Sequence, residues 1–214
     1  MVTKVAVKTS PKTLYIEGQD FDVTNGALTI TYNDGTSKDV KMSDATVAGY
    51  NKNVVGMQSV VVTYGEKSVT LNVTVVKKSV TNVSIHKYPV DLEYIEGQAL
   101  DTTGGVLLVS YDNGTSEVLP MSNATVSGYN SALVGKQTVT VSYKGTKTTF
   151  EVEVIDKVVT GIVVKTSPKV SYIEGQELDV TAGMITATYN DGEVRSIPMN
   201  ECSITGYDKN VIGK

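Results

Sequence analysis

Acidic side chains recur at fixed positions along this 214-residue chain, and carboxylates that recur in this way could bind a metal ion. Calcium prefers hard oxygen ligands that converge from adjacent loops. One acidic position follows a tyrosine, a second lies a few residues later, and a third lies in a turn rich in Asn, Asp and Gly. The candidate calcium ligands are Glu17, Asp22, Asp34, Glu96, Asp101, Asp112, Glu174, Asp179 and Asp191.

The same residues have an alternative role as turn formers. The turn reads Asn-Asp-Gly at residues 33–35 and 190–192, but Asp-Asn-Gly at residues 112–114. A metal site would resist that exchange of acid and amide. A turn tolerates it, because both side chains accept hydrogen bonds from nearby backbone N–H groups and both accept a left-handed backbone. We therefore favour structural turns over calcium, and predict no metal and no cofactor.

The remaining reactive side chains are one histidine and one cysteine. His86 takes the place of a lysine in the other copies, on the outward side of a predicted strand, with no Ser or Cys partner nearby in sequence. Cys202 takes the place of an alanine, which indicates a small, partly buried niche, and it has no partner for a disulfide. No metalloprotease, esterase, phosphate-loop or dinucleotide motif occurs. We predict no catalytic residue and no enzyme activity.

Composition excludes several further classes of protein. The net charge is −4 and no copy carries a stripe of Lys and Arg, which argues against nucleic acid as a partner. No apolar run approaches the ~18 residues of a membrane-spanning helix, and the first residues do not resemble a secretion signal. We expect Met1 to begin a segment taken from a longer chain. The chain has 12 Tyr and no Trp, and tyrosines at repeated positions are typical of packing with the hydroxyl bonded to backbone.

A repeat of about 79 residues organises these features. The pentapeptide Tyr-Ile-Glu-Gly-Gln occurs at residues 15–19, 94–98 and 172–176. Each copy continues with an Asp, a Gly and an alternating apolar run that ends in Tyr. The predicted modules are residues 1–78, 79–157 and 158–214.

Within each copy the apolar residues alternate with polar ones, which indicates half-buried strands. Leu28, Ile30 and Tyr32 face one way, and the Asn-Asp-Gly turn after them predicts a hairpin into residues 36–42. A second hairpin follows at residues 60–75. Six or seven short strands per copy predict an all-β chain of two-sheet sandwiches.

The joints between copies are short. Residues 76–80 and 155–157 contain no Gly and no Pro, unlike a flexible linker. This feature predicts a stiff, elongated rod.

The third copy stops early, because Gly213 aligns with Gly56 and Gly135 and the last hairpin is missing. In the first copy this hairpin supplies seven apolar side chains that are expected to be buried, each contributing roughly 1.5–3 kcal/mol. An isolated third copy should therefore not fold. We expect disorder, completion by strands from another chain, or a boundary drawn through a longer array; strand exchange is favoured by open sheet edges.

The linked series Tyr-x-x-Gly-Gln, Asp, Gly, a strand ending in Tyr-x-x-Gly, and Gly-x-Gln-x-Val-x-Val-x-Tyr resembles the bacterial immunoglobulin-like (Ig-like) domain of group 3. The resemblance implies tandem Ig-like β-sandwich modules, the third lacking its last hairpin. It also implies a secreted or cell-surface protein, mostly of Gram-positive bacteria, without catalytic residues.

Two roles follow from the resemblance. The first is a structural spacer or stalk whose partners are neighbouring domains of a longer surface protein. The alternative is an adhesive or carbohydrate-binding module that recognises a glycan, or a host or cell-wall protein, through its loops.

Overall fold

The computed structural model describes residues 1–213, and contacts between residues divide the chain into two compact units. The first unit comprises residues 1–87, 105–125 and 142–148. The second comprises residues 88–104, 126–141 and those from 149 onward. Strands dominate both units, and helix within residues 1–213 is confined to three single 3₁₀ turns. None of these turns has the length or apolar character needed to span a bilayer.

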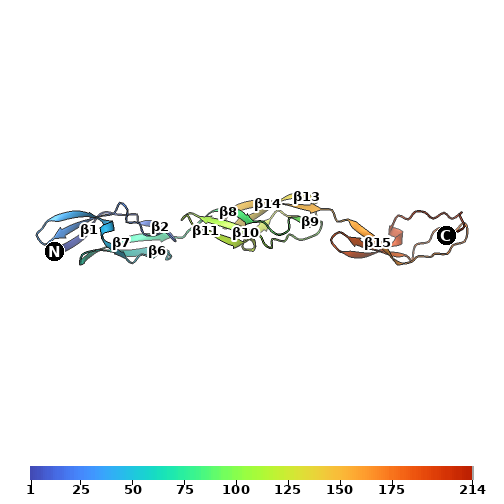
Figure 1. Cartoon of the computed structure of the whole chain (residues 1–214), viewed down its shortest axis with the longest axis horizontal. Coiled ribbons are helices and arrows are strands. Elements are labelled where there is room, and N and C mark those ends of the chain that lie inside the picture. The colour runs from blue at the N-terminus through green and yellow to red at the C-terminus, as the bar shows by residue number, and fades with distance from the viewer. Residues whose placement is uncertain (214) are drawn as a thin grey trace. The chain divides into compact units, whose positions relative to one another are not determined.

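The first module is a complete two-sheet sandwich that lies within the first unit (Figure 1). One sheet has the order β1-β3-β4, and the other has the order β2-β7-β6-β5. The bounds are β1 (Val2–Thr9), β2 (Leu14–Ile16), β3 (Ala27–Tyr32), β4 (Ser37–Lys41), η1 (Met42–Asp44), β5 (Thr46–Ala48), β6 (Gly56–Tyr64) and β7 (Lys67–Val76).

The core of the first module forms because alternate residues of each strand face inward. In β3, Leu28 and Ile30 are fully buried, while the threonine between them is half-buried. In β6, Val60 and Val62 are fully buried, whereas Val61 is 37% exposed on the other face. The period-two pattern of the sequence therefore predicts the buried face correctly.

The strand predicted over residues 36–42 ends one residue earlier than expected. Strand β4 ends at Lys41, and Met42 begins the 3₁₀ turn η1 with its side chain fully buried. The Met42 N–H donates to the Gly26 carbonyl at 2.9 Å, and the Ala45 N–H donates to the Met42 carbonyl at 3.1 Å. These two bonds turn the chain out of the sheet while Met42 stays in the core.

The second module repeats both sheets. One has the order β11-β10-β8, with Val83, Leu107, Val109 and Tyr111 buried, and the other has the order β12-β13-β14-β9, with Val139 and Val141 fully buried. The bounds are β8 (Val80–Lys87), β9 (Glu93–Ile95), β10 (Val106–Tyr111), β11 (Ser116–Pro120), η2 (Met121–Asn123), β12 (Thr125–Ser127), β13 (Gly135–Tyr143) and β14 (Thr146–Ile155).

The third module contains a single sheet of order β15-β16-β17. Its bounds are β15 (Val159–Thr166), β16 (Met184–Tyr189), β17 (Val194–Pro198) and η3 (Met199–Glu201). Residues 171–173 and 203–205, the counterparts of β2 and β5, have no strand assignment. The prediction of tandem β-sandwich modules, the third without its last hairpin, is therefore confirmed. The exact module boundaries stay a prediction.

Candidate functional site

The repeated pentapeptide builds a buried tyrosine corner rather than a reactive site. The Tyr15 ring is 1% exposed, and its hydroxyl donates to the Lys12 carbonyl at 2.8 Å and accepts from the Asp22 N–H at 3.2 Å. Burial raises the pKa of Tyr15, which keeps the hydroxyl a neutral donor. The expected bond between a repeated tyrosine and the backbone is confirmed here, and the counterparts are Tyr94 and Tyr172.

The glycine and glutamine of the pentapeptide close the turn beside this tyrosine. Gly18 has a φ of +93°, which an L side chain rarely adopts. The Gln19 Oε1 accepts from the Ile16 N–H at 3.0 Å, and the Gln19 carbonyl accepts from the Tyr50 hydroxyl at 2.7 Å. The loop therefore favours glycine at position 18, and the Gln19 side chain closes the turn onto the Ile16 N–H.

The glutamate of the pentapeptide contributes its backbone to the sheet. The Glu17 N–H donates to the Val76 carbonyl at 2.8 Å, next to the parallel pairing of β2 with β7. The side chain of Glu17 is half-buried, and those of Glu96 and Glu174 are exposed. The three glutamates therefore share a backbone position and differ in burial.

The aspartate that follows each pentapeptide caps a short turn. The Asp22 Oδ1 accepts from the Thr24 N–H at 2.8 Å, and Asp179 accepts from both the Thr181 N–H and the Thr181 hydroxyl. Hydrogen bonds from Thr181 hold the pKa of Asp179 below its usual range. The Asp101 Oδ1 accepts in the same way from the N–H two residues later.

The Asn/Asp turns explain why acid and amide exchange freely. At the first position, the Asn33 Oδ1 accepts from the amine of Met1 at 2.9 Å. The Asp112 Oδ1 accepts from the Ser79 N–H, and the Asn190 Oδ1 accepts from the Val158 N–H, both at 3.0 Å. At the second position, the Oδ1 atoms of Asp34, Asn113 and Asp191 accept from the N–H two residues later. Asn and Asp carry the same acceptor oxygen, so each position tolerates either residue.

Within residues 1–213, no three side chains of His, Cys, Asp or Glu gather in a way that could hold a metal ion. The structure instead gives the turn carboxylates local hydrogen-bond partners. We therefore expect calcium in the millimolar range to leave the melting temperature of the chain unchanged relative to chelator. Differential scanning calorimetry checks this, and a calcium-dependent rise that Asp34→Asn abolishes would contradict it.

A cluster of charges lies where the second joint meets the third module. The Lys157 Nζ lies 2.5 Å from the Asp191 Oδ2 and also binds the Glu193 carboxylate. Arg195 donates to the same Glu193 carboxylate from Nε at 2.6 Å and from Nη2 at 3.0 Å. The bonds from Arg195, and then those from Lys157, lower the pKa of Glu193 to about 2. Sequence reasoning missed this cluster, because Lys157 and its partners are far apart along the chain.

The depressed pKa of Glu193 gives a pH prediction for this cluster. The ionised form is stabilised in the folded state, so the contribution is present above the ordinary glutamate pKa of 4.5 and is lost as the pH falls through about 2. Arg195→Gln is expected to raise the pKa of Glu193 more than Lys157→Gln does. A carboxyl ¹³C NMR titration measures the pKa of Glu193 in each variant, and Lys165→Gln, on the same sheet, is the control. An unchanged pKa of Glu193 in Arg195→Gln would contradict the role given to Arg195.

His86 and Cys202 lie where the sequence predicts. His86 is exposed at the end of β8, and Cys202 is half-buried with its Sγ 3.7 Å from the Pro198 carbonyl.

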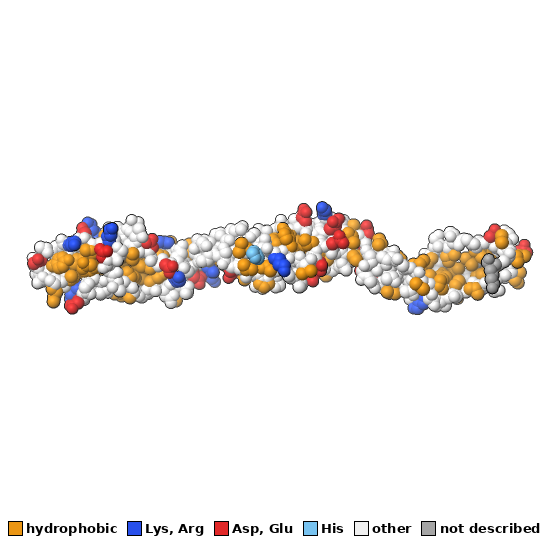
Figure 2. All heavy atoms as spheres, in the orientation of Figure 1, with side chains coloured by type: hydrophobic (Ala, Val, Ile, Leu, Met, Phe, Trp, Pro, Cys, Tyr) orange, Lys and Arg blue, Asp and Glu red, His pale blue; other side chains and the backbone are white. Residues whose placement is uncertain are grey.

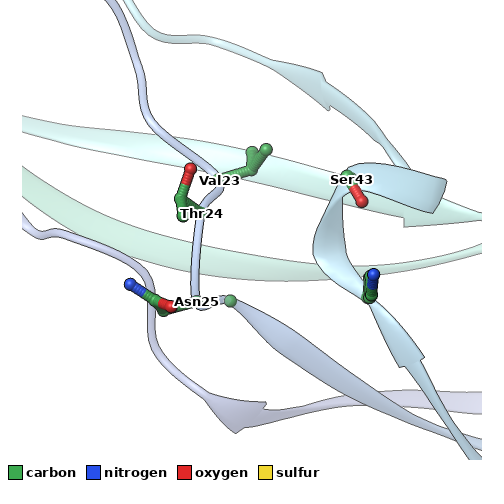
Figure 3. Close-up of a pocket in the computed structure, with 6 residues that line it drawn as sticks. Val23, Thr24, Asn25 and Ser43 are labelled. Carbon is green, nitrogen blue, oxygen red and sulfur yellow. The ribbon is translucent and has the colours of Figure 1, made fainter.

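A hollow of about 420 Å³ lies over the first module, between the loop of residues 23–26 and the turn η1 (Figure 3). Val23 points towards the side that carries Ser43, while Asn25 points the other way. Asn25 has a φ of 65° and Gly26 has no room for a side chain, because a Cβ there would lie 2.9 Å from the Met42 Sδ. The lining includes no carboxylate, so the hollow offers no acid–base pair.

A buried glutamine in the last hairpin of the second module holds a loop against a strand, and sequence reasoning missed this role. The Gln137 side chain is 7% exposed, and its Nε2 donates to the Asn130 carbonyl at 2.8 Å and to the Leu133 carbonyl at 2.5 Å. Its Oε1 accepts from the Asn130 N–H at 2.8 Å. Gln58 makes the same three bonds in the first module. The pattern Gly-x-Gln at the start of both hairpins is the sequence feature that could have predicted this glutamine.

Comparisons with known proteins agree with this architecture. The model of the bacterial Ig-like domain (group 3) matches residues 8–75, 87–154 and 165–214. A pectate lyase L of Thermoclostridium stercorarium is 24% identical over 215 residues, covering 95% of this chain and 17% of that protein. An exo-beta-1,6-galactobiohydrolase of Bifidobacterium longum subsp. longum is 33% identical over 110 residues, covering 49% of this chain and 7% of that protein.

Among solved structures, domains 4 and 5 of the S-layer protein SbsC are 20% identical, with 72% of this chain and 98% of that chain covered and a TM-score of 0.28. This chain spans less than a fifth of the length of the two curated relatives. The three family matches together cover most of its residues. The chain therefore belongs to the family of bacterial Ig-like domains of group 3.

Proposed function

We propose that the chain is a non-catalytic spacer of tandem Ig-like modules within a longer bacterial protein that is secreted or displayed at the cell surface. The observation that carries this proposal is the construction of the joints. Strand β7 ends at Val76 and β8 begins at Val80, while β14 ends at Ile155 and β15 begins at Val159. A connection of only three residues between strands leaves neighbouring modules little freedom to move independently.

Each joint is also fixed to the module that follows it. Two hydrogen bonds join Ser79 to Asp112: the Ser79 N–H donates to the Asp112 Oδ1 at 3.0 Å, and the Asp112 N–H donates to the Ser79 carbonyl at 3.1 Å. The Lys78 Nζ lies 3.9 Å from the centre of the Tyr111 ring, a cation–π contact. Val158 and Asn190 repeat the paired bonds at the second joint. These contacts support the boundaries 1–78, 79–157 and 158–214 as proposed module limits.

We propose that the modules are not catalytic, because their repeated polar residues have structural roles. The repeated Asp and Asn side chains accept backbone N–H bonds in turns, and the tyrosine hydroxyls bond to backbone. The two curated relatives are named as a pectate lyase L and an exo-beta-1,6-galactobiohydrolase, and both are far longer than this chain. We therefore propose that the partners of these modules are neighbouring domains, catalytic or wall-binding, and not nucleic acid.

Small-angle scattering tests the spacer. A stiff spacer predicts an elongated particle, and inserting Gly-Ser-Gly-Ser after Lys78 is expected to broaden its distance distribution. The matched control inserts the same four residues after Gly35, in the exposed turn between β3 and β4 of the first module. The proposal fails if the chain has the dimensions of one compact globule, or if both insertions have the same effect.

A second role, adhesion or glycan binding, is favoured by one exposed aromatic residue. Tyr88 does not follow the repeat, is 55% exposed, and lies 6.5 Å from Phe150 between ring centres. Val90 beside it is 72% exposed. A glycan array and a pull-down on intact cell wall test this role. Loss of the binding signal in Tyr88→Ala, but not in a Tyr64→Ala control, would support a binding role over a spacer.

A further inference from the structure

The Asn/Asp turn of each module differs between copies in one further way besides its acceptor oxygen. An Asn side chain carries an Nδ2 amide that donates hydrogen bonds, whereas an ionised Asp only accepts them. In the second module the amide stands at the second position of the turn, Asn113, and in the third module it stands at the first position, Asn190. Exchanging acid and amide therefore keeps an acceptor at both positions but moves the donor from one to the other.

Asn113 uses its donor to reach the first module. Its Nδ2 donates to the Glu17 carbonyl, 96 residues earlier in the chain, at 2.5 Å. Both residues lie in the first compact unit. Gly18 packs against the same amide, because a Cβ there would lie 2.9 Å from the Asn113 Nδ2. The turn of the second module therefore contacts the pentapeptide of the first, and the absence of a side chain at Gly18 leaves room for it.

This contact depends on short-range bonds. Figure 2 shows Lys and Arg side chains mixed with Asp and Glu over the visible face of the first module, with no broad area of one sign there. That face therefore offers no extended charge that could orient a neighbouring module from a distance. The contacts at Glu17 and Gly18 are the ones that can fix the turn in place.

Asn190 uses its donor on the joint and not on the preceding pentapeptide. Its Nδ2 donates to the Asp156 carbonyl at 2.9 Å. Asp156 belongs to the three-residue connection between β14 and β15. This bond therefore holds the connection to the third module.

The second position of the third module's turn is an acid that cannot replace the missing donor. The hydrogen bond from Lys157 holds the pKa of Asp191 below its usual range, so the carboxylate is ionised and only accepts. Gly97, the counterpart of Gly18, is not packed in the same way. A Cβ added there would meet no atom within 4 Å among residues 1–213.

The same exchange redirects the lysine of each joint. The Lys78 Nζ lies 3.9 Å from the centre of the Tyr111 ring. Its counterpart Lys157 lies 2.5 Å from the Asp191 Oδ2 and 5.3 Å from the centre of the Tyr189 ring. A neutral amide at the second position leaves the ammonium on the aromatic face, whereas a carboxylate there binds the ammonium itself. The second position of the turn therefore determines the contacts of the whole joint.

Taking the chain as the spacer proposed above, we propose that this turn is the surface by which a module engages the module before it, and that the position of its amide sets how firmly the two are held. The order Asp-Asn binds the turn to the preceding pentapeptide and gives a stiff joint. The order Asn-Asp binds only the connection and gives a joint that bends more easily. The partner that fits the surface is a Tyr-Ile-Glu-Gly-Gln turn, through its glutamate carbonyl and its glycine.

Pulsed electron paramagnetic resonance tests this by measuring distances between two spin labels in the full chain. The labels are attached at Thr70→Cys and Thr149→Cys, equivalent exposed positions on β7 and β14, with Cys202→Ala so that no other thiol reacts. Losing one hydrogen bond of ordinary strength should raise the population of the unbound turn about fivefold. Asn113→Asp is therefore expected to broaden the distribution of distances.

The variants leave the turn itself intact. The first module has Asp34 at this position, and the Oδ1 atoms of Asp34 and Asn113 both accept from the N–H and the hydroxyl of the threonine two residues later. Asp112→Asn is the matched control, because it keeps the amide at the second position, and it should not broaden the distribution. Exchanging both residues, which gives the order of the third module, should broaden it as Asn113→Asp does.

A second measurement follows the lysine of the joint by NMR. In Asn113→Asp the Lys78 ammonium is expected to leave the Tyr111 ring for the new carboxylate, so the protons beside its amine should lose their ring-current shift. Unchanged Lys78 signals would overturn the role given to the second position of the turn.

The outcomes separate this proposal from that of the spacer. A narrow distribution that Asn113→Asp leaves unchanged overturns the role of the turn alone, as does equal broadening by Asp112→Asn. A broad distribution with the natural turn in place counts against the spacer itself. A narrow distribution that only the variants without Asn113 broaden supports both.

Discussion

Replacing Val60 by aspartate is expected to unfold the first module, while the same change at the next residue, Val61, is tolerated. Val60 is fully buried in β6, and Val61 is 37% exposed on the opposite face. An unpaired carboxylate in a core costs roughly 3–5 kcal/mol or more, and a domain has only about 5–15 kcal/mol of net stability. A module of this size lies towards the lower end of that range.

Hydrogen exchange of the whole chain measures both variants at once. Val60→Asp should abolish protection in β6 and β7 and leave β13 and β14 protected, so the second module is an internal control. Val61→Asp should leave both hairpins protected. If both variants lost protection equally, the assignment of the two faces of β6 would be wrong.

Replacing one apolar side chain of the alternating strand by alanine should have very different effects on the stability of the first and third modules. Leu28 is fully buried in β3, so Leu28→Ala is expected to lower the free energy of unfolding of the first module by about 2–5 kcal/mol. Ile185 holds the equivalent position in β16 but is only half-buried. We expect Ile185→Ala to cost less than about 1 kcal/mol, since little buried surface is lost.

Urea titration followed by NMR, residue by residue, separates the modules in this comparison. Leu107→Ala serves as the matched control, because Leu107 is fully buried in the second module and should behave like Leu28. A cost at Ile185 equal to that at Leu28 would mean that the third module has a closed core.

The sequence predicts the faces of the strands well, because burial on one side of a sheet imposes a period of two. Leu28 and Ile30, which the alternation predicts on one face of their strand, are both fully buried. The turns were predictable for a related reason: Asn, Asp and Gly satisfy local backbone geometry that few other residues accept. The missing hairpin followed from counting the repeat.

Other features needed the structure because they join residues that are distant in the chain. The parallel pairing of β2 with β7 involves three residues, too few to show a period. The bonds from Gln137 to Asn130 and Leu133 depend on how a loop folds back on a strand. The cluster around Lys157 likewise required the third module to bring Glu193 beside the joint.

The central claim is that each module is held together by its last hairpin and that the third module remains open without one. Hydrogen–deuterium exchange of the unmodified chain tests it most directly. We predict strong protection in β6, β7, β13 and β14 and far faster exchange throughout residues 159–206. Protection of the third module equal to that of the first two would contradict the claim.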